Sequence, residues 1–247
     1  MNLGFSIKEC GKEIKLDFGR KIESKKRYLS ELLNDKVILD LENAKKLLEK
    51  KGDVLVYEVY NLWKFDEVAK NFLENFGLMM DVTLLKHGVF SLKEGEAFCT
   101  YGHAHQKNLG EVYQVLKNEC FLLLAHKKTF NSYLIKLKEG YSFFIHPSFI
   151  HRLISGKKDS LILNFVPEDA GHDYDIVKNK GFPFHVFYDK NKKLYFKENE
   201  KYPKAGLVLV ENIKKLDVLK LAQKNPEKLR EILRRPKDIY ALTKNYL

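Results

Sequence analysis

The chain has 247 residues, 45% of them hydrophobic and 13% aromatic, so it can bury a sizeable core and is not predicted to be disordered. Its three cysteines are odd in number and lack a CxxC spacing, which excludes a disulfide framework and favours a reduced, cytoplasmic compartment. No apolar run has the length of a signal peptide or a membrane span, so we expect no membrane partner.

The formal net charge of +11 is concentrated at the C-terminal end. Residues 201–247 hold 12 Lys or Arg and 5 Asp or Glu, which gives +7 of the +11. This segment is either a solvated basic face or a docking surface. No motif of a nucleic-acid-binding domain accompanies the charge, so a nucleic-acid partner is not expected.

The sequence pattern of residues 1–78 predicts an arm, short helices and a strand, which pack on the rest of the chain. Apolar residues recur at helical spacing over 37–51, and Gly52 closes that helix. Residues 54–63 alternate like a strand, and residues 66–77 have the pattern of a helix that ends at Gly77.

Residues 79–200 alternate between apolar and polar positions in short stretches separated by turn residues. Many short strands at this spacing indicate an all-β sandwich or barrel. Residues 117–119, 138–140 and 189–192 carry hairpin signals. Residues 201–247 return to helical periodicity, with Pro226 and Pro236 placed to begin two short helices.

The stretch 102–118, GHAHQKNLGEVYQVLKN, contains a metal-binding pattern. In a strand, His103 and His105 point to the same side, about 7 Å apart along the backbone. Glu111 begins the next predicted strand, and His151 in HPSFIHR is the obvious fourth ligand. Three imidazoles and a carboxylate suit Fe(II), Mn(II), Ni(II) or Zn(II), with coordination positions left for a substrate.

A second polar stretch, VPEDAGHDYDIVKNKGF, follows the last apolar strands. It is too polar for a core, and its Asp169, His172, Asp173 and Tyr174 predict an acid–base cluster at the mouth of the barrel.

These blocks resemble a known family. VYEVY (56–60), TYGHAH (100–105), EVY (111–113), HPSFIHR (146–152) and PEDAGHDYDIVKNKGF (167–182) are similar to the cupin-type glucose-6-phosphate isomerases of archaea and some bacteria. The resemblance implies a mainly β fold, the cupin double-stranded β-helix barrel (an antiparallel jelly roll), at 79–200. Short helices at 1–78 and a basic helical extension at 201–247 would flank it.

The resemblance also implies an activity, the reversible interconversion of glucose 6-phosphate and fructose 6-phosphate in glycolysis and gluconeogenesis. It implies a cytoplasmic homodimer with one divalent metal ion per subunit, Fe(II) first and Mn(II), Ni(II) or Zn(II) as alternatives. The metal ligands would be His103, His105, Glu111 and His151. The catalytic residues would be Glu111, His172 and Tyr113. The substrate-binding residues would be Tyr57, Thr83, Thr100, Gly102, Tyr113, His172 and Tyr174.

Several alternatives stay open at this point. Glu111 is either the base of an enediol route or a fixed ligand during a hydride shift. The same ligand set supports an Fe(II) cupin oxygenase, and the basic tail is compatible with a non-catalytic sugar-phosphate sensor that docks a partner. Val166 stands where the family usually has a phosphate-binding tyrosine, which predicts weaker substrate binding or a substitute donor such as Lys86 or His146.

Overall fold

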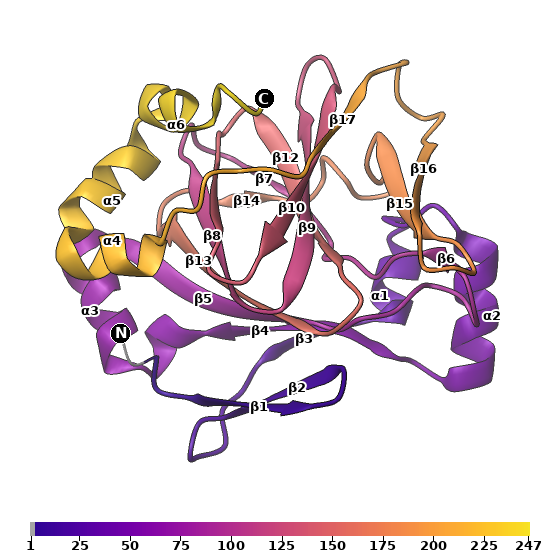
Figure 1. Cartoon of the computed structure of the whole chain (residues 1–247), viewed down its shortest axis with the longest axis horizontal. Helices are drawn as coiled ribbons and strands as arrows, with labels where there is room; N and C mark the ends of the chain where they lie inside the picture. Colours follow the sequence, from indigo (N-terminus) through magenta and orange to yellow (C-terminus); the bar gives the residue numbers. More distant parts are fainter. Residues whose placement is uncertain (1–2) are drawn as a thin grey trace.

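The computed structural model describes residues 3–247, and its largest sheet has six antiparallel strands (Figure 1). They are β3 (Lys25–Tyr28), β4 (Leu55–Asn61), β5 (Leu78–Leu85), β8 (Glu111–Lys117), β11 (Ser142–Ile145) and β13 (Ser160–Pro167). Their spatial order is β11-β8-β13-β5-β4-β3. Strands from the N-terminal arm and from the predicted barrel therefore belong to one sheet, and the boundary drawn at residue 78 stays a prediction.

A second sheet has four strands, and residues of both sheets meet in one hydrophobic core. The strands are β9 (Glu119–His126), β10 (Ser132–Lys138), β12 (Phe149–Ser155) and β17 (Leu207–Val210), in the order β12-β9-β10-β17. β17 pairs in parallel with β10 and lies within the tail that we expected to be helical. Helical periodicity in the rest of the tail does not extend to its apolar run LVLV, which forms a strand instead.

The remaining strands are short. β1 (Ser6–Cys10) and β2 (Glu13–Asp17) form a two-stranded hairpin of their own near the N-terminus. β7 (Ala104–His105) pairs with β14 (His172–Asp173). β15 (Phe184–Tyr188) pairs with β16 (Leu194–Glu198) and with β6 (Gly95–Glu96). The hairpin predicted at 189–192 is confirmed, since it joins β15 and β16.

The other two predicted hairpins are wrong. Residues 117–119 and 138–140 do reverse the chain, with Asn118 at φ 61° and Gly140 at φ 78°. However, β8 and β9 belong to different sheets, and so do β10 and β11. The two turns are therefore corners that carry the chain from one sheet to the other. A local turn signal reports a reversal, whereas the choice of strand partner depends on the whole sheet.

Short helices precede the barrel: α1 (Leu29–Asn34), α2 (Leu41–Lys51), the 3-10 turn η1 (Leu62–Lys64) and α3 (Glu67–Phe76). The helix expected over 37–51 begins later, because Asp40 caps it by accepting a hydrogen bond from Asn43 N at 3.3 Å. α3 matches the prediction, with Asp66 as its N-cap and Gly77 at φ 60° after its last residue.

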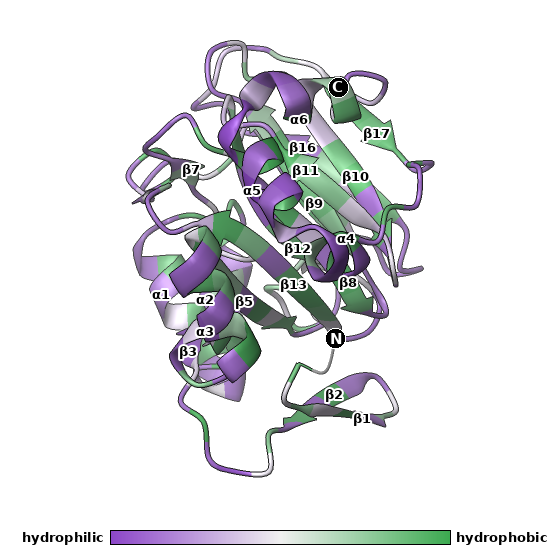
Figure 2. Ribbon diagram, turned by 90° about the vertical axis from the view of Figure 1, so that its left-hand side faces the viewer, coloured by the Kyte–Doolittle hydropathy of each residue, from purple (hydrophilic) through white to green (hydrophobic). Residues whose placement is uncertain are grey.

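The tail contains three helices, α4 (Val218–Lys224), α5 (Pro226–Arg234) and α6 (Pro236–Thr243). Pro226 and Pro236 begin α5 and α6 as predicted, and α4 also lies within the segment of expected helical periodicity. The helices lie over the larger sheet, and Figure 2 shows apolar strands beneath helices whose outward side is largely hydrophilic. Leu229, Leu233 and Ile239 are fully buried there.

The larger sheet thus has two buried faces of different character. Along β5, Met80, Val82 and Leu84 belong to the core shared with the helices. Asp81 and Thr83 alternate with them and line a cavity inside the barrel. The polar positions of the strand alternation therefore face a site rather than solvent.

The predicted mainly β jelly-roll barrel, with short N-terminal helices and a C-terminal helical extension, is confirmed. Within residues 3–247, the helices are too short or too polar to span a membrane. The three cysteines are free, Cys10 exposed and Cys99 and Cys120 buried.

Candidate active site

The structure brings together the four side chains that the sequence suggested as metal ligands. One donor atom from each of His103, His105, Glu111 and His151 lies within 4.8 Å of the other three. Glu111 Oε2 is 2.9 Å from His151 Nε2, 3.4 Å from His105 Nε2 and 3.8 Å from His103 Nε2. Donor atoms this close can share one ion, because metal–ligand bonds are about 2.0–2.2 Å long.

Backbone pairing explains why these residues meet. His103 and His151 form an antiparallel bridge, with His103 N donating to His151 O at 3.1 Å and His151 N donating to His103 O at 2.9 Å. His105 follows in β7, and Glu111 is the first residue of β8. The cluster therefore forms where the 106–110 turn brings β8 back beside the two histidines.

The histidine nitrogens fit a bound cation. Nε2 of His103 and Nε2 of His105 are buried without a hydrogen-bond partner in the described chain. His105 Nδ1 lies 2.6 Å from the carbonyl oxygen of Leu109, so Nδ1 carries the proton and Nε2 presents a lone pair. Two buried nitrogens without partners are costly unless a ligand satisfies them.

The charge states also fit a cation. Burial lowers the pKa of His103 well below its usual value and lowers the pKa of His151, so both imidazoles stay neutral near pH 7. Burial alone would raise the pKa of Glu111, but the close approach of the His105 and His151 rings outweighs burial and holds that pKa well below its usual value. The cluster therefore contains an ionised carboxylate beside the neutral imidazoles of His103 and His151.

The carboxylate of Glu111 is oriented by a second strand. Asn164 Nδ2 on β13 donates to Glu111 Oε1 at 2.7 Å, which leaves Oε2 facing the histidines. Asn164 pairs with Tyr113 across the sheet. Sequence reasoning missed Asn164, although its place on the inward side of β13 follows from strand alternation once the sheet order is known.

The cluster opens into a cavity of about 300 Å³ inside the barrel. The residues that the sequence placed around the substrate all line it: Tyr57, Thr83, Thr100, Gly102, Tyr113, His172 and Tyr174. The structure thus gathers into one cavity residues that are spread over more than a hundred positions of the chain.

A family model described as glucose-6-phosphate isomerase matches residues 30–204. The isomerase of Thermococcus litoralis is 34% identical over 193 residues, which cover 76% of this chain and 95% of that protein. The isomerase of Pyrococcus furiosus is 31% identical over 195 residues, 77% of this chain and 96% of that protein. The chain belongs to the glucose-6-phosphate isomerase family.

Among solved structures, an oxalate oxidase matches with a TM-score of 0.36 and 14% identity, covering 48% of this chain and 54% of that one. The oxalate decarboxylase of Bacillus subtilis matches with a TM-score of 0.32 and 11% identity, covering 45% of this chain and 24% of that one.

In this member of the family, the 167–174 stretch separates into two parts. His172 lies in the cavity, with its ring 4.5 Å from that of His103, and Tyr174 stacks on His172 at 5.8 Å. Asp169 instead forms ion pairs with Lys107 and Arg234. Asp173 accepts a hydrogen bond from Ile176 N at 3.4 Å. The predicted four-residue acid–base cluster is therefore wrong for Asp169 and Asp173, since neither lines the cavity.

The two tyrosines of the inner wall are hydrogen-bond donors at neutral pH. Burial raises the pKa of both Tyr57 and Tyr113. Tyr57 Oη accepts a hydrogen bond from Tyr101 N at 3.2 Å, and its own proton is available to a ligand. Thr100 Oγ1 accepts a bond from Leu153 N at 3.0 Å in the same way.

Four other polar residues of the cavity were not anticipated. Lys25 and Arg27 come from β3, Asn61 from β4 and Asp81 from β5. Asn61 Nδ2 donates to Asp81 Oδ1 at 2.7 Å, and burial raises the pKa of Asp81 to about 6. Asp81 alternates with the core residues Met80 and Val82, and that spacing is the signal that could have found it. The two cations of β3 carry no such signal, because Lys26 between them is exposed.

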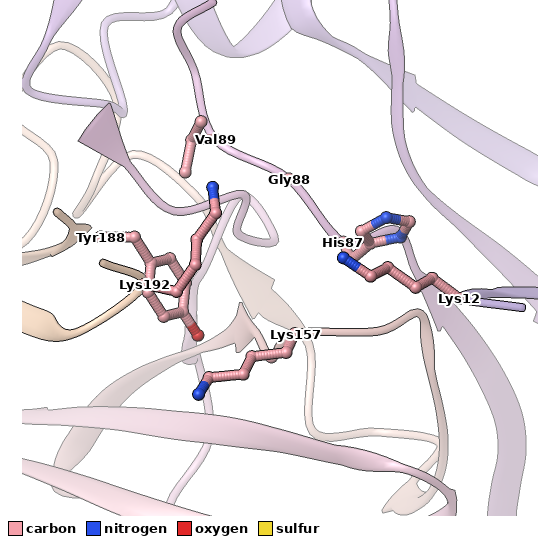
Figure 3. A pocket seen from close by; sticks show the side chains of 8 residues that line it. Lys12, His87, Gly88, Val89, Lys157, Tyr188 and Lys192 are labelled. Carbon is pink, nitrogen blue, oxygen red and sulfur yellow. The ribbon is translucent and has the colours of Figure 1, made fainter. Parts of the chain in front are cut away.

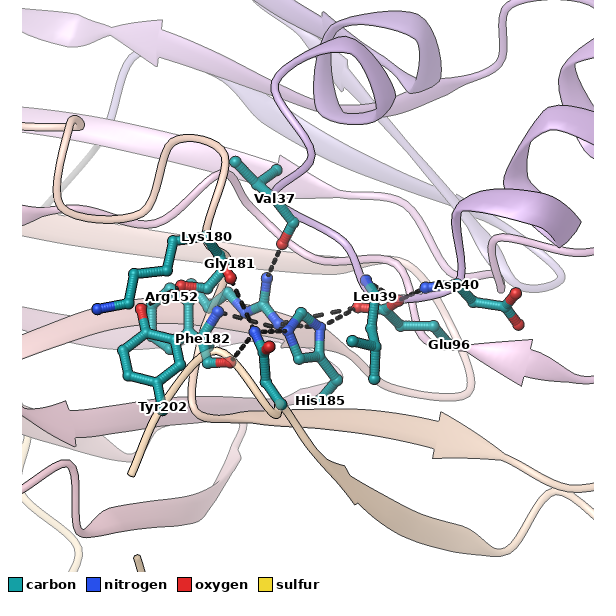
Figure 4. A network of polar contacts seen from close by, with 11 residues as sticks. Val37, Leu39, Asp40, Glu96, Arg152, Lys180, Gly181, Phe182, His185 and Tyr202 are labelled. Carbon is teal, nitrogen blue, oxygen red and sulfur yellow. Dashed lines mark hydrogen bonds and ion pairs between the residues drawn. The ribbon is translucent and has the colours of Figure 1, made fainter. Parts of the chain in front are cut away.

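A buried polar network lies around the residue that follows His151 on β12 (Figure 4). Arg152, the next residue on β12, is fully buried and donates through Nη1 to Val37 O at 3.0 Å. His185 Nδ1 lies 3.1 Å from Arg152 Nη2 and 2.5 Å from Glu96 Oε1. Glu96 Oε2 in turn accepts from Leu39 N at 2.7 Å. The network ties the strand that carries His151 to the segment before α2.

A separate basic hollow of about 140 Å³ shares no lining residue with the cavity. Figure 3 shows Lys12, Lys157 and Lys192 around it, together with His87 and Tyr188. The residues that line it include no carboxylate. We assign it no part in catalysis, because the metal-ligand cluster lies in the other cavity.

Proposed function

We propose that the protein interconverts glucose 6-phosphate and fructose 6-phosphate, with one divalent metal ion held by His103, His105, Glu111 and His151. One observation carries the proposal: in a chain of this family, these four donor atoms lie within 4.8 Å of one another at the end of a cavity of about 300 Å³. Fe(II) is the first candidate for the ion, and Mn(II), Ni(II) and Zn(II) are the alternatives.

When bound, a divalent ion would serve as a Lewis acid that stabilises negative charge on the sugar oxygens. The chain's own groups bind and orient the sugar. Tyr57 and Tyr113 keep their phenol protons and can donate to sugar hydroxyls. Thr83, Thr100 and the Gly102 backbone lie on the cavity wall, where the family's phosphate-binding residues are expected.

His172 is the proposed proton carrier for ring opening. Burial lowers the pKa of His172, so its imidazole is neutral near pH 7 and can accept a proton from the anomeric hydroxyl. Tyr174 stacks on that ring at 5.8 Å and fixes its orientation. His172 thus lies beside the ligand cluster without being one of its four members.

Glu111 is the proposed base for the transfer of hydrogen between C1 and C2. Its pKa lies well below the usual value, so it is ionised and able to take a proton from C2 and return it to C1. The alternative is a direct hydride shift during which Glu111 remains in place. Isomerisation in D2O separates the two routes, because a proton held by Glu111 exchanges with solvent and a shifted hydride does not.

We further infer that the protein acts as a homodimer in the cytoplasm, within glycolysis and gluconeogenesis. The family resemblance supports this inference. Sedimentation of the purified protein measures the dimer directly.

The function is tested by a coupled assay for fructose 6-phosphate. Protein stripped of metal should gain activity on addition of Fe(II) or Mn(II) and lose it with a chelator, while elemental analysis gives the ion retained on purification. Oxygen consumption without isomerisation would support the oxygenase instead, and sugar-phosphate binding without turnover would support the sensor.

A further inference from the structure

The edge strand of the larger sheet places two cations at the rim of the cavity. Lys25 and Arg27 of β3 both line it, and Lys26 between them does not. This follows from strand alternation, which sends positions 25 and 27 to the inward side. Neither residue belongs to a motif that the sequence singled out.

Sheet register puts Lys25 in the same row of the sheet as the hydroxyl of Thr83. Lys25 pairs with Val59 on β4, and Val59 pairs with Thr83 on β5. Lys25 and Thr83 are therefore two strands apart on the same face, about 10 Å between backbones at ordinary strand spacing. Val59 lies between them on the same face, so a lysine side chain extended over Val59 would direct its ammonium towards the threonine hydroxyl.

Lys25 has no carboxylate within ion-pair distance in the described chain, although its charge acts on Asp81. Within residues 3–247, its ammonium makes no ion pair, whereas Arg27 is paired with Glu31. Asp81 is the carboxyl group on the same wall, and it is buried and bonded to Asn61. Lys25 is thus a cation in the substrate cavity without a fixed anionic partner.

The donors proposed from sequence to replace the absent tyrosine do not reach this cavity. Val166 is buried and offers no hydroxyl. Lys86 is paired with Asp159, and His146 Nδ1 lies 2.7 Å from Ser148 Oγ. Neither lines the cavity, so the expectation that Lys86 or His146 substitutes there is wrong.

We propose that Lys25, assisted by Arg27, binds the phosphate of the substrate and makes the enzyme select phosphorylated over free sugars. This inference rests on the proposed function, because it assigns one end of the same cavity. The phosphate would lie between the β3 cations and the hydroxyl of Thr83, with the sugar carbons directed towards the ligand cluster. A charge-assisted bond of this kind changes affinity by about tenfold or more.

The test compares Lys25→Gln with Lys26→Gln. The two side chains carry the same charge on the same strand, but Lys26 is exposed and outside the cavity. Lys25→Gln should raise the KM for fructose 6-phosphate about tenfold or more. The resulting fall in kcat/KM should come from KM, with kcat changed much less. Lys26→Gln should keep the wild-type KM. Equal KM values for the two variants would overturn the proposal.

Calorimetry makes the result independent of turnover. Binding of glucose 6-phosphate and of inorganic phosphate should weaken in Lys25→Gln and not in Lys26→Gln, while binding of free glucose stays the same in both. If the protein binds sugar phosphates in this pattern without isomerising them, the phosphate site stands and the proposed function fails. If it isomerises them and Lys25→Gln binds phosphate like the wild type, the phosphate site fails and the function stands. Thermal unfolding of both variants checks that they are folded.

Discussion

Arg234 Nη2 on α5 donates to Asp169 Oδ1 at 2.7 Å, which ties the C-terminal extension to the loop that carries His172 and Tyr174. A second contact lies close by, where Gly110 N donates to Leu233 O at 2.8 Å, one residue before Glu111. The extension therefore contacts both segments that lead into the ligand cluster. The basic tail is joined to the barrel rather than being a free appendage.

Arg234→Gln should lower kcat/KM by a few fold, because it releases the 167–174 loop that orients His172. The loss of stability should be small, about 1 kcal/mol or less, since both partners are about one-third exposed and such pairs contribute little. Arg235→Gln is the control, because within the described residues the Arg235 side chain forms its one ion pair with Glu231, at 3.8 Å on the helix surface. Steady-state kinetics that do not distinguish the two variants would contradict this role for Arg234.

Ile239→Ala should lower the free energy of unfolding by about 2–4 kcal/mol, the usual cost of truncating a fully buried aliphatic side chain. Its side chain packs directly on Gly110, where an added Cβ would lie 2.0 Å from Ile239 Cδ1. Tyr240→Ala is the matched control, as Tyr240 is 60% exposed and should cost less than 1 kcal/mol. Urea unfolding measures the change in the free energy of unfolding for both variants. Similar values for the two would mean that α6 is not part of the core.

Glu111→Gln should reduce turnover by several orders of magnitude while weakening substrate binding much less. The substitution keeps the shape of the side chain and removes the carboxylate that faces the histidines. Single-turnover kinetics together with calorimetric binding separate the two effects. Unchanged turnover would exclude both a base role and a ligand role for Glu111.

His172→Ala should lose most activity and still retain the metal. His172 lies beside the cluster, but it is not among the four residues whose donor atoms converge. Elemental analysis compares the metal content of this variant with that of His151→Ala, which should lose the ion. Loss of metal from His172→Ala would show that the ligand set is misassigned.

Asp81→Asn should stabilise the metal-free protein at pH 8 and have little effect near pH 4. Burial raises the pKa of Asp81 to about 6, so the unfolded chain gives up this proton more readily than the folded one. The cost of ionising Asp81 in the folded protein therefore lowers its stability as the pH rises. This cost is absent below the ordinary carboxyl pKa, grows between about pH 4 and pH 6, and is constant above pH 6. A shift of roughly two units corresponds to about 3 kcal/mol at most. Urea unfolding at the two pH values checks the sign, and a gain confined to pH 4 would contradict it.

Much of the site was visible in the sequence because its signals are local. The i,i+2 spacing of His103 and His105 fixes their common side, and Pro226 and Pro236 mark helix starts through their own backbone geometry. The matching blocks pointed to the family, which the comparison with known proteins establishes.

The tertiary structure decided what depends on strand order. Lys25 and Asn164 reach the cavity because β3 and β13 lie in the same sheet as β8. The residues that flank them in the sequence do not predict this position. The turns at 117–119 and 138–140 look like hairpins and are corners between sheets. The placement of α5 against the 106–110 turn is equally nonlocal. Sequence by itself determined where side chains point along each element, since that depends on backbone period. Only the folded chain determined which elements are neighbours, since that depends on burying all the apolar faces together.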